Sequence, residues 1–380
     1  MATDTITAIL PDIYEALDSV SREPVGMIGA VTMSSSSERA SLNQNITVDI
    51  EGEIAGVTAT PAMTAPEPAA QTPTVANITI SNSKAYPFQL TGDTQKGYNS
   101  GVGWENGYAG RIAQALRAAT NDVESTLAGL HTKFSRAYGT AGTTPFATTL
   151  ADTANLGKIL TDNGASAHDR HLVMDTAAGA NVRLLTQLTK ANEAGSDATL
   201  RMGSLLNIHN FDLAESGQIA TSTAGTGTSY TSATTGYAIG TTDIPIITGS
   251  GTVVAGDVVT FAGDTNKYVV TTGVAAPGTI TIAAPGLRKA LAASAVAMTI
   301  VAASARNMAF TRSAIVLAAR PVATPSDGDA ATDRQMIVDP VSGLPFEIAL
   351  YKGYKMNRYE INLAWGAEVI KPEHTALNLG

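Results

Sequence analysis

Histidine and aspartate form one short cluster that could do chemistry, His168-Asp169-Arg170-His171. Two histidines at this spacing can bind a metal ion, but the sequence offers neither a cysteine nor a third ligand at helical spacing. A solvated turn before a strand explains the cluster better. A hydrolase that uses His168 or His209 with an aspartate is an alternative, although the chain lacks the Gly-x-Ser-x-Gly motif of many serine hydrolases.

A glycine-rich segment, Gly101 to Gly107, precedes a predicted helix and is superficially like a nucleotide-binding loop. Such a loop follows an apolar strand, so that its backbone amides can hold phosphate at the helix N-terminus. Here the polar residues Lys96 to Ser100 stand in that place, and the glycine spacing differs by one. The segment therefore predicts a flexible joint, and no Walker sequence occurs elsewhere.

The segment from Tyr351 to Tyr359 alternates basic and aromatic side chains, which could stack on a single nucleic-acid strand. A hairpin turn is the favoured interpretation, because the net charge of −9 repels phosphate. Asp327, Asp329 and Asp333 could bind calcium, but their spacing does not match an EF-hand loop. The sequence thus predicts no catalytic residues, no metal site and no cofactor.

Composition narrows the class of protein further. The chain has 380 residues, no cysteine and 15% charged residues, and only 5% of its residues are aromatic. These values predict a core of small aliphatic side chains in about two or three compact units. The most apolar stretch, Leu291 to Ser304, is too short to cross a membrane, and the acidic N-terminus lacks a signal-peptide pattern. We expect a soluble protein that folds in a reducing cytoplasm.

The first predicted element is a short amphipathic helix, with apolar residues at Leu10, Ile13, Tyr14, Leu17 and Val20. Its apolar stripe is too small to anchor a domain alone. We expect the helix to dock on the body of the protein or on another chain.

A long hairpin is predicted next, because residues 46–51 and 77–81 each alternate apolar and polar side chains. The proline-rich segment Pro61 to Pro73 would be its tip. A two-stranded ribbon is only marginally stable in water. We therefore expect a neighbouring subunit to cover its apolar face.

The strongest helical pattern runs from about Gly110 to Tyr138, followed by Gly139 as a left-handed cap. At 1.5 Å per residue this is a rod of roughly 40 Å. Such a rod would be a support for other elements. Its core residues are predicted to be Ile112, Leu116, Val123, Leu127, Leu130 and Phe134.

The remaining patterns predict an α+β body interrupted by a β domain. Residues 217–304 are rich in threonine, glycine, alanine and serine, which favours a small inserted β domain. The body is predicted to contain helices at 149–161 and 179–190 and strands at 171–174 and 314–317, and the insert to contain strands at 258–262, 268–271 and 279–282.

Two alternating runs near the C-terminus predict a second long antiparallel hairpin, joined across Lys352 to Tyr354. Together with the first hairpin and the rod, it predicts an extended molecule with exposed sheet edges. The apolar members of the runs are Phe346, Ile348 and Leu350, and Tyr359, Ile361, Leu363 and Trp365.

The order of these elements resembles the major capsid proteins of tailed bacteriophages, which have the Hong Kong 97-type fold. Three segments carry the local resemblance: Leu200 to Ser216 with its Phe-x-x-x-x-Ser ending, Asn307 to Leu317, and Tyr359 to His374. The insert is similar to the extra β domain of a coat-protein subgroup of short-tailed phages, through Ala255 to Gly263 and Gly278 to Ile282.

This resemblance implies an α+β, Hong Kong 97-like capsid fold with peripheral and axial domains. The implied domains are an N-terminal arm with a short helix (1–45), an extended hairpin loop (46–92), a peripheral domain with a spine helix (93–145), a first axial part (146–216), an inserted β domain (217–304), a second axial part (305–339), and the peripheral hairpin with the C-terminus (340–380).

The implied function is that of a major capsid protein without enzymatic activity. It would assemble as pentamers and hexamers into the icosahedral head shell of a virion, in the host cytoplasm, with scaffolding and portal proteins as partners. Genomic double-stranded DNA would be enclosed without sequence-specific binding, and no membrane would be involved. The residues expected at intersubunit contacts are Ile46, Val48, Ile50, Ile78, Ile80 and Phe88.

A secreted adhesin or surface-layer protein is the alternative, suggested by the threonine- and glycine-rich segment. That class predicts repeats of the segment and an export signal. The sequence shows one copy of the segment and no such signal.

Overall fold

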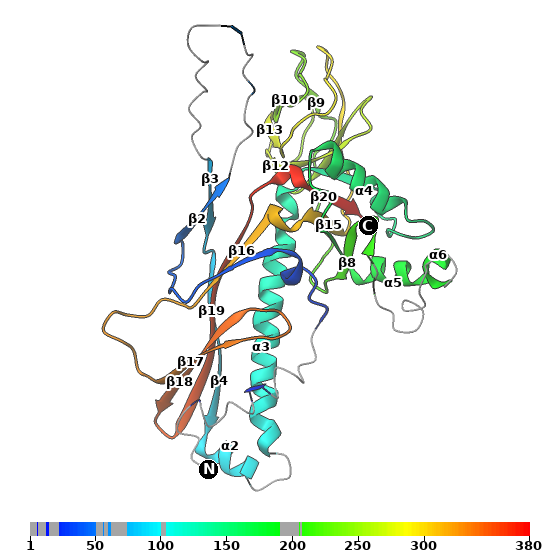
Figure 1. Cartoon of the computed structure of the whole chain (residues 1–380). Coiled ribbons are helices and arrows are strands. Elements are labelled where there is room, and N and C mark those ends of the chain that lie inside the picture. The colour runs from blue at the N-terminus through cyan, green and yellow to red at the C-terminus, as the bar shows by residue number, and fades with distance from the viewer. Residues whose placement is uncertain are drawn as a thin grey trace.

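The structure is a computed structural model of the chain. It describes residues 6, 13–14, 23–50, 56, 60–61, 74–99, 104–190, 205 and 207–380. Most of the predicted N-terminal helix, and residues 62–73 of the predicted hairpin tip, lie outside the described residues. A long helix and a sheet form the lower part of the molecule in Figure 1, and a second, larger sheet with its short helices lies above them.

The lower sheet has six strands in the order β1-β16-β19-β18-β17, and β4 also pairs with β19. All its pairs are antiparallel except β1 with β16. The predicted C-terminal hairpin is confirmed, because β18 and β19 pair from Glu347↔Asn362 to Gly353↔Met356. The strands are β1 (Thr32–Ser35), β4 (Asn82–Thr91), β16 (Ile315–Arg320), β17 (Ala331–Val338), β18 (Pro345–Gly353) and β19 (Met356–Val369).

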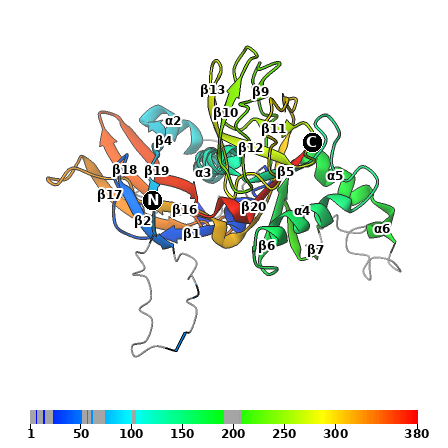
Figure 2. The same cartoon turned by 90° about the horizontal axis from the view of Figure 1, so that it is seen from above.

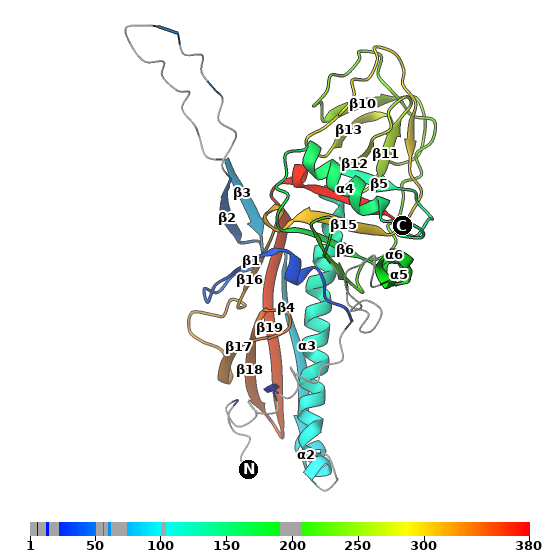
Figure 3. The ribbon, with the colours of Figure 1, turned by 45° about the vertical axis from the view of Figure 1, so that its right-hand side comes forward.

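The long helix α3 (Trp104–Gly129) packs on this sheet (Figure 3). Its buried stripe meets apolar side chains of β18 and β19, such as Ile348 and Ile361, in one large core cluster. The indole N–H of Trp365 donates to Thr126 Oγ1 of α3 at 3.1 Å. All six predicted core residues of the rod belong to this cluster: Ile112, Leu116, Val123, Leu127, Leu130 and Phe134.

The prediction that this helix continues to Tyr138 is wrong. The α-helix ends at Gly129, a 3₁₀ turn η2 (Leu130–Lys133) follows, and residues Arg136–Gly139 form strand β5. Gly139 does have φ of +95°, but it ends a strand and not a helix. The apolar spacing continues past Gly129, whereas pairing of β5 with β20 and β12 draws the backbone into a sheet.

The predicted first hairpin is confirmed as an antiparallel pair of residues 45–50 with residues 74–79. β2 (Asn45–Ile50) and β3 (Thr74–Thr79) form a separate two-stranded ribbon, whereas β4 belongs to the six-stranded sheet. Figure 3 shows this ribbon rising away from the body. The short helix α2 (Gly92–Asn99) then connects β4 to the region of α3.

The upper sheet has twelve strands in the order β7-β8-β6-β15-β20-β5-β12-β13-β10-β9, extended by β11 and β14 beside β12. A second core cluster lies between this sheet and the helices α4 (Ala151–Asp162) and α5 (Thr176–Leu184). The predicted helix at 179–190 is instead α5 and the short α6 (Thr186–Thr189), interrupted at Leu185. The strands before the insert and after it are β6 (Arg170–Met174), β7 (Asn207–Ile208), β8 (Phe211–Glu215), β15 (Arg306–Thr311) and β20 (Thr375–Leu379).

Residues between β8 and β15 form a group of strands with its own core cluster. Tyr268, Val270 and Ile280 are fully buried in it. β12 pairs with β5, so these strands continue the sheet of the body (Figure 2). The strands are β9 (Thr231–Ser232), β10 (Asp243–Ile247), β11 (Val258–Phe261), β12 (Lys267–Thr272), β13 (Gly278–Ile282) and β14 (Met298–Ile300).

Within the described part of the chain, no helix has the length and apolar character needed to cross a membrane.

Candidate functional site

The predicted histidine cluster is a structural contact at the start of β6. His171 is buried, and its Nε2 lies 3.0 Å from Asp169 Oδ1. Asp169 also accepts from Arg312 Nε at 3.2 Å. The described residues contain no group of three His, Asp or Glu side chains placed to hold a metal ion. His209, the other histidine considered, contacts Thr153 Oγ1 at 2.8 Å through its Nδ1.

The segment from Tyr351 to Tyr359 is a hairpin, as favoured from the sequence, with its turn at Tyr354 and Lys355. Tyr359 is buried and stacks on Phe88 with ring centroids 5.3 Å apart. Tyr351 donates its hydroxyl to Asp329 at 2.9 Å. Only Tyr354 of these tyrosines is largely exposed, so the segment does not form a row of stacking rings.

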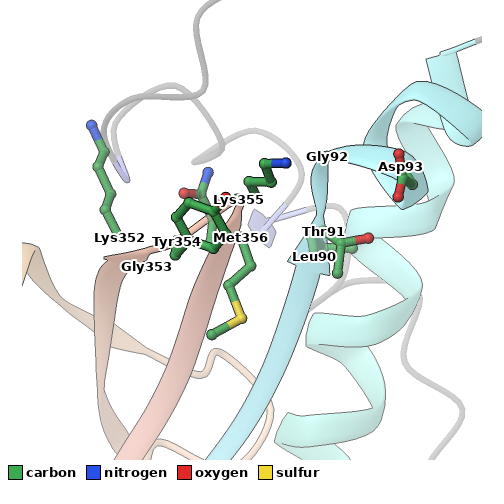
Figure 4. Close-up of a pocket in the computed structure, with 10 residues that line it drawn as sticks. Leu90, Thr91, Gly92, Asp93, Lys352, Gly353, Tyr354, Lys355 and Met356 are labelled. Carbon is green, nitrogen blue, oxygen red and sulfur yellow. The ribbon is translucent and has the colours of Figure 1, made fainter.

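A hollow of about 790 Å³ lies beside this turn, lined by Leu90 to Asp93 and Lys352 to Asn357. Figure 4 shows Lys352, Lys355 and Asp93 around it, with Lys352 directed away from the others. These groups are two cations and one carboxylate without a nucleophile and base in contact.

The predicted aspartate group is dispersed into separate contacts. Arg334 holds the pKa of Asp329 at about 2, and Asp333 Oδ2 accepts from the backbone of Ile6 at 2.7 Å. Arg334 also pairs with Glu347 at 2.6 Å, and Glu347 in turn accepts from Arg39 at 2.6 Å. This network fastens β17 and the segment around Arg39 to β18, and the aspartates do not form a calcium site.

The residues predicted at contacts with other chains lie elsewhere in the structure. Of the residues predicted at such contacts, Ile78 and Ile80 are fully buried in the chain's own fourth core cluster, with Ala318 and Ala364. Their own chain covers both side chains within the subunit. Phe88 packs on Tyr359 within the protomer.

Four of the predicted contact residues remain partly exposed, namely Phe88 on β4 and three residues on β2. Ile46, Val48 and Ile50 lie at alternate positions of β2, and the residues between them are exposed. Ile46 and Val48 pack against the fourth core cluster at the base of the ribbon. The lower face of β2 is therefore bound to the body, whereas the ribbon extends beyond it (Figure 1).

A clamp between the N-terminal segment and α3 was not predicted from the sequence. Glu124 is fully buried, and its carboxylate accepts the backbone N–H groups of Met27 and Ile28 at 2.8 and 3.0 Å. Burial raises the pKa of this carboxyl. Two turns earlier in α3, Arg117 donates to Glu23 and holds the pKa of Glu23 at about 2.

The exposed edge of β17 was also missed. Met336, Val338 and Val341 are among the most exposed large apolar side chains of the described residues. The strand reads Ala-Thr-Asp-Arg-Gln-Met-Ile-Val, which lacks the strict alternation that would have signalled a half-buried strand.

The sequence matches no protein-family model and no curated protein. Among solved structures, the chain is similar to the one described as the capsid structure of the cyanophage P-SCSP1u, with a TM-score of 0.53 and 10% identity over 95% of this chain and 89% of that chain. It is also similar to a chain of Mycobacterium phage Che8, with a TM-score of 0.45 and 12% identity over 95% and 90% of the two chains. The capsid of the native GTA particle gives a TM-score of 0.46 and 10% identity over 95% and 91%.

The similarity to the cyanophage capsid structure extends over nearly the whole of both chains. At this low identity it defines the fold and not the residues of any site. The chain has the fold of a tailed-phage capsid protein, as the resemblance in the sequence predicted.

Proposed function

We propose that the chain is a major capsid protein of the Hong Kong 97 type, which assembles as pentamers and hexamers into an icosahedral shell around double-stranded DNA. The observation that carries this proposal is the fold shared with the cyanophage capsid structure over 95% of the chain. A protein of this kind has a structural role, and we propose no enzymatic activity for it. The shared fold does not favour the secreted adhesin or surface-layer alternative.

The shape of the subunit supports the proposal. The β2–β3 ribbon extends from the body, and the six-stranded sheet ends at an exposed strand (Figure 3). Monomeric proteins usually protect such edges. Ribbons and edges of this kind are expected where neighbouring subunits complete the surface. Ile46 and Val48 pack in part on the body, and we propose that their remaining exposed surface and Ile50 contact a neighbour.

Within this function, we assign the lower sheet and α3 to a peripheral domain and the body of the twelve-stranded sheet to an axial domain. Residues 217–304 would be an inserted β domain of the subgroup found in short-tailed phages. Their separate core cluster supports this division, because a domain needs its own buried interior.

The partners would be further copies of the chain, a scaffolding protein and a portal protein. Assembly would take place in the host cytoplasm, and the product would be the shell of the virion. A net charge of −9 supports enclosure of DNA without strong binding, since binding to the phosphate backbone depends on basic side chains.

Electron microscopy of the purified full chain, expressed with and without a scaffolding partner, tests the proposal. We expect closed shells or separate capsomers with five- and six-fold symmetry. A chain that stays monomeric under every assembly condition would contradict it.

A further inference from the structure

β17 is the last strand of the six-stranded sheet, and no described strand pairs with its outer side. Figure 2 shows it at the border of the sheet, on the opposite side of β19 from α3. Long exposed edges are usually blocked by charged residues or proline, because they bind other strands. This edge therefore needs an explanation.

The pairing with β18 determines which backbone groups of β17 point outward. Val338 lies opposite Pro345, which has no N–H to donate, and Asp339 N–H donates to Leu344 O at 3.0 Å. Opposed residues of an antiparallel pair alternate between hydrogen-bonded and non-bonded pairs. Val338 and Met336 are thus in non-bonded pairs, and their N–H and C=O groups point away from β18.

The side chains of the same two residues are apolar and exposed. Met336 is 43% exposed and Val338 is 59% exposed, and Val341 just beyond the strand is 67% exposed. The charged residues of the strand have other partners, because Asp333 accepts from Ile6 and Arg334 pairs with Glu347. Among the described strands, none pairs with the outward backbone groups of Met336 and Val338, and the side chains beside these groups are uncharged.

We propose that β17 pairs antiparallel with β17 of a second copy of this chain, about a two-fold axis at Ile337. In this register Met336 of each copy lies opposite Val338 of the other. Both residues have outward backbone groups, so the two pairs form four backbone hydrogen bonds. The four exposed apolar side chains come together, and no like charges are opposed.

A second copy fits this edge because the edge is complementary to itself. A two-fold interface brings one patch against the same patch of its partner. The pattern of outward groups at Met336 and Val338 is symmetric about Ile337, so the same donors and acceptors serve both copies. This inference rests on the proposed function, since a shell built from copies of one chain contains contacts between identical subunits.

Cysteine pairing tests the register, because the natural chain has no cysteine. Opposed residues of a hydrogen-bonded pair have Cα atoms about 5.5 Å apart, a separation that a disulfide spans. Met336→Cys and Val338→Cys chains are assembled separately and as an equal mixture, oxidised, and run on non-reducing gels. We expect disulfide-linked dimers in the mixture, several-fold more than in either single preparation.

Two results would overturn the inference. Absence of dimers from the assembled mixture would mean that the two edges do not meet. Equally strong dimers from Met336→Cys alone would place Met336 opposite itself and contradict the register. Shell formation by the unchanged chain, scored in the same preparations, tests the proposed function separately.

Val338→Pro provides a second test without cysteine. Proline removes an outward N–H but no bond to β18, so the subunit should unfold at the same temperature as the parent. We expect the yield of closed shells to fall at least several-fold. Ile239→Pro cannot serve as the control for Val338→Pro, because Ile239 lies in a turn. Lysine substitutions provide the matched pair instead: Met336→Lys changes the β17 edge, and Ile239→Lys changes an exposed apolar residue elsewhere. We expect only Met336→Lys to lower the yield, and equal yields for the parent, Val338→Pro and Met336→Lys would refute the inference.

Discussion

At the scale of single residues, the buried carboxylate of Glu124 is the least expected feature. It lies on the inner face of α3 and accepts two backbone N–H groups at the point where the N-terminal segment begins a 3₁₀ turn, η1 (Ile28–Ala30). Buried backbone donors nearly always have a partner, because a missing one is costly. Glu124 therefore decides where the N-terminal segment joins the body.

Replacing Glu124 with alanine should lower the free energy of unfolding by about 1–3 kcal/mol, the cost of leaving buried donors unpaired. Denaturant titration of the unassembled subunit measures this loss. Glu124→Gln keeps a side chain of the same length with one acceptor oxygen, so its free energy of unfolding should fall by less. Equal stability of the alanine variant and the parent would show that the clamp is not needed.

Glu23 should make the subunit sensitive to acid. The Arg117 hydrogen bond lowers the pKa of Glu23 from 4.5 to about 2, so the folded state favours the charged carboxylate. This contribution is present above pH 4.5 and is lost as the pH falls toward 2. Glu23→Gln should lower stability at pH 7 and leave it unchanged near pH 2, as measured by unfolding at both values.

A result in the opposite sense, with the larger effect of Glu23→Gln at low pH, would contradict the pairing with Arg117. Lys158→Gln is a suitable control, since Lys158 forms an exposed i,i+4 pair with Asp162 in α4.

At the scale of elements, the sequence predicted the helices and strands that bury one regular stripe of apolar side chains. The alternation of Ile348 and Leu350 in β18, and of Ile361 and Leu363 in β19, was sufficient to predict the hairpin and its turn. The spacing from Ile112 to Leu127 likewise predicted α3. These patterns are local, so no knowledge of partners was needed.

Elements whose course depends on distant partners were predicted poorly. The residues after Gly129 continue a helical spacing, but β20, at the other end of the chain, pairs with them as β5. Arg39, Glu347 and Arg334 form one network although they are far apart in sequence. Neither relation leaves a periodic pattern, and the clamp at Glu124 was missed for the same reason.

The junction of the ribbon with the sheet depends on Gly366 in β19. A Cβ atom at this position would lie 2.0 Å from the carbonyl oxygen of Thr79 in β3. Gly366→Ala should therefore displace the ribbon and destabilise the subunit by more than about 1 kcal/mol, the lower end of the range for overpacking. Hydrogen exchange at β2 and β3 should increase.

Gly110→Ala is the matched control, because a Cβ there meets nothing within 4 Å and the residue lies inside α3. Alanine should stabilise the helix by about 0.5–1 kcal/mol. If both variants changed stability in the same direction and by the same amount, close approach at Gly366 would not be the cause.

At the scale of the whole molecule, the described residues form one large core cluster around α3 and three smaller clusters. The chain has few aromatic residues, and because it has no cysteine, no disulfide joins these clusters. For a shell protein, contacts between subunits would add the stability that each core lacks, because binding to the folded state stabilises it.

The β2–β3 ribbon provides the clearest test of the proposal that contacts between subunits stabilise the shell. Ile50 pairs with Thr74 at the end of the ribbon, so removal of residues 61–73 leaves the β2–β3 pairs and ten connecting residues in place. The fold of the subunit should survive, because the base of the ribbon packs through Ile78 and Ile80.

We expect an unchanged unfolding temperature for the subunit, but few or no closed shells by electron microscopy, because the tip can no longer reach a neighbour. A matched variant replaces the deleted residues with a glycine-serine segment of the same length, which separates the effect of the ribbon's length from that of its sequence. Recovery of shells in this variant would show that length is sufficient. Normal shells from the deletion itself would show that the tip makes no assembly contact.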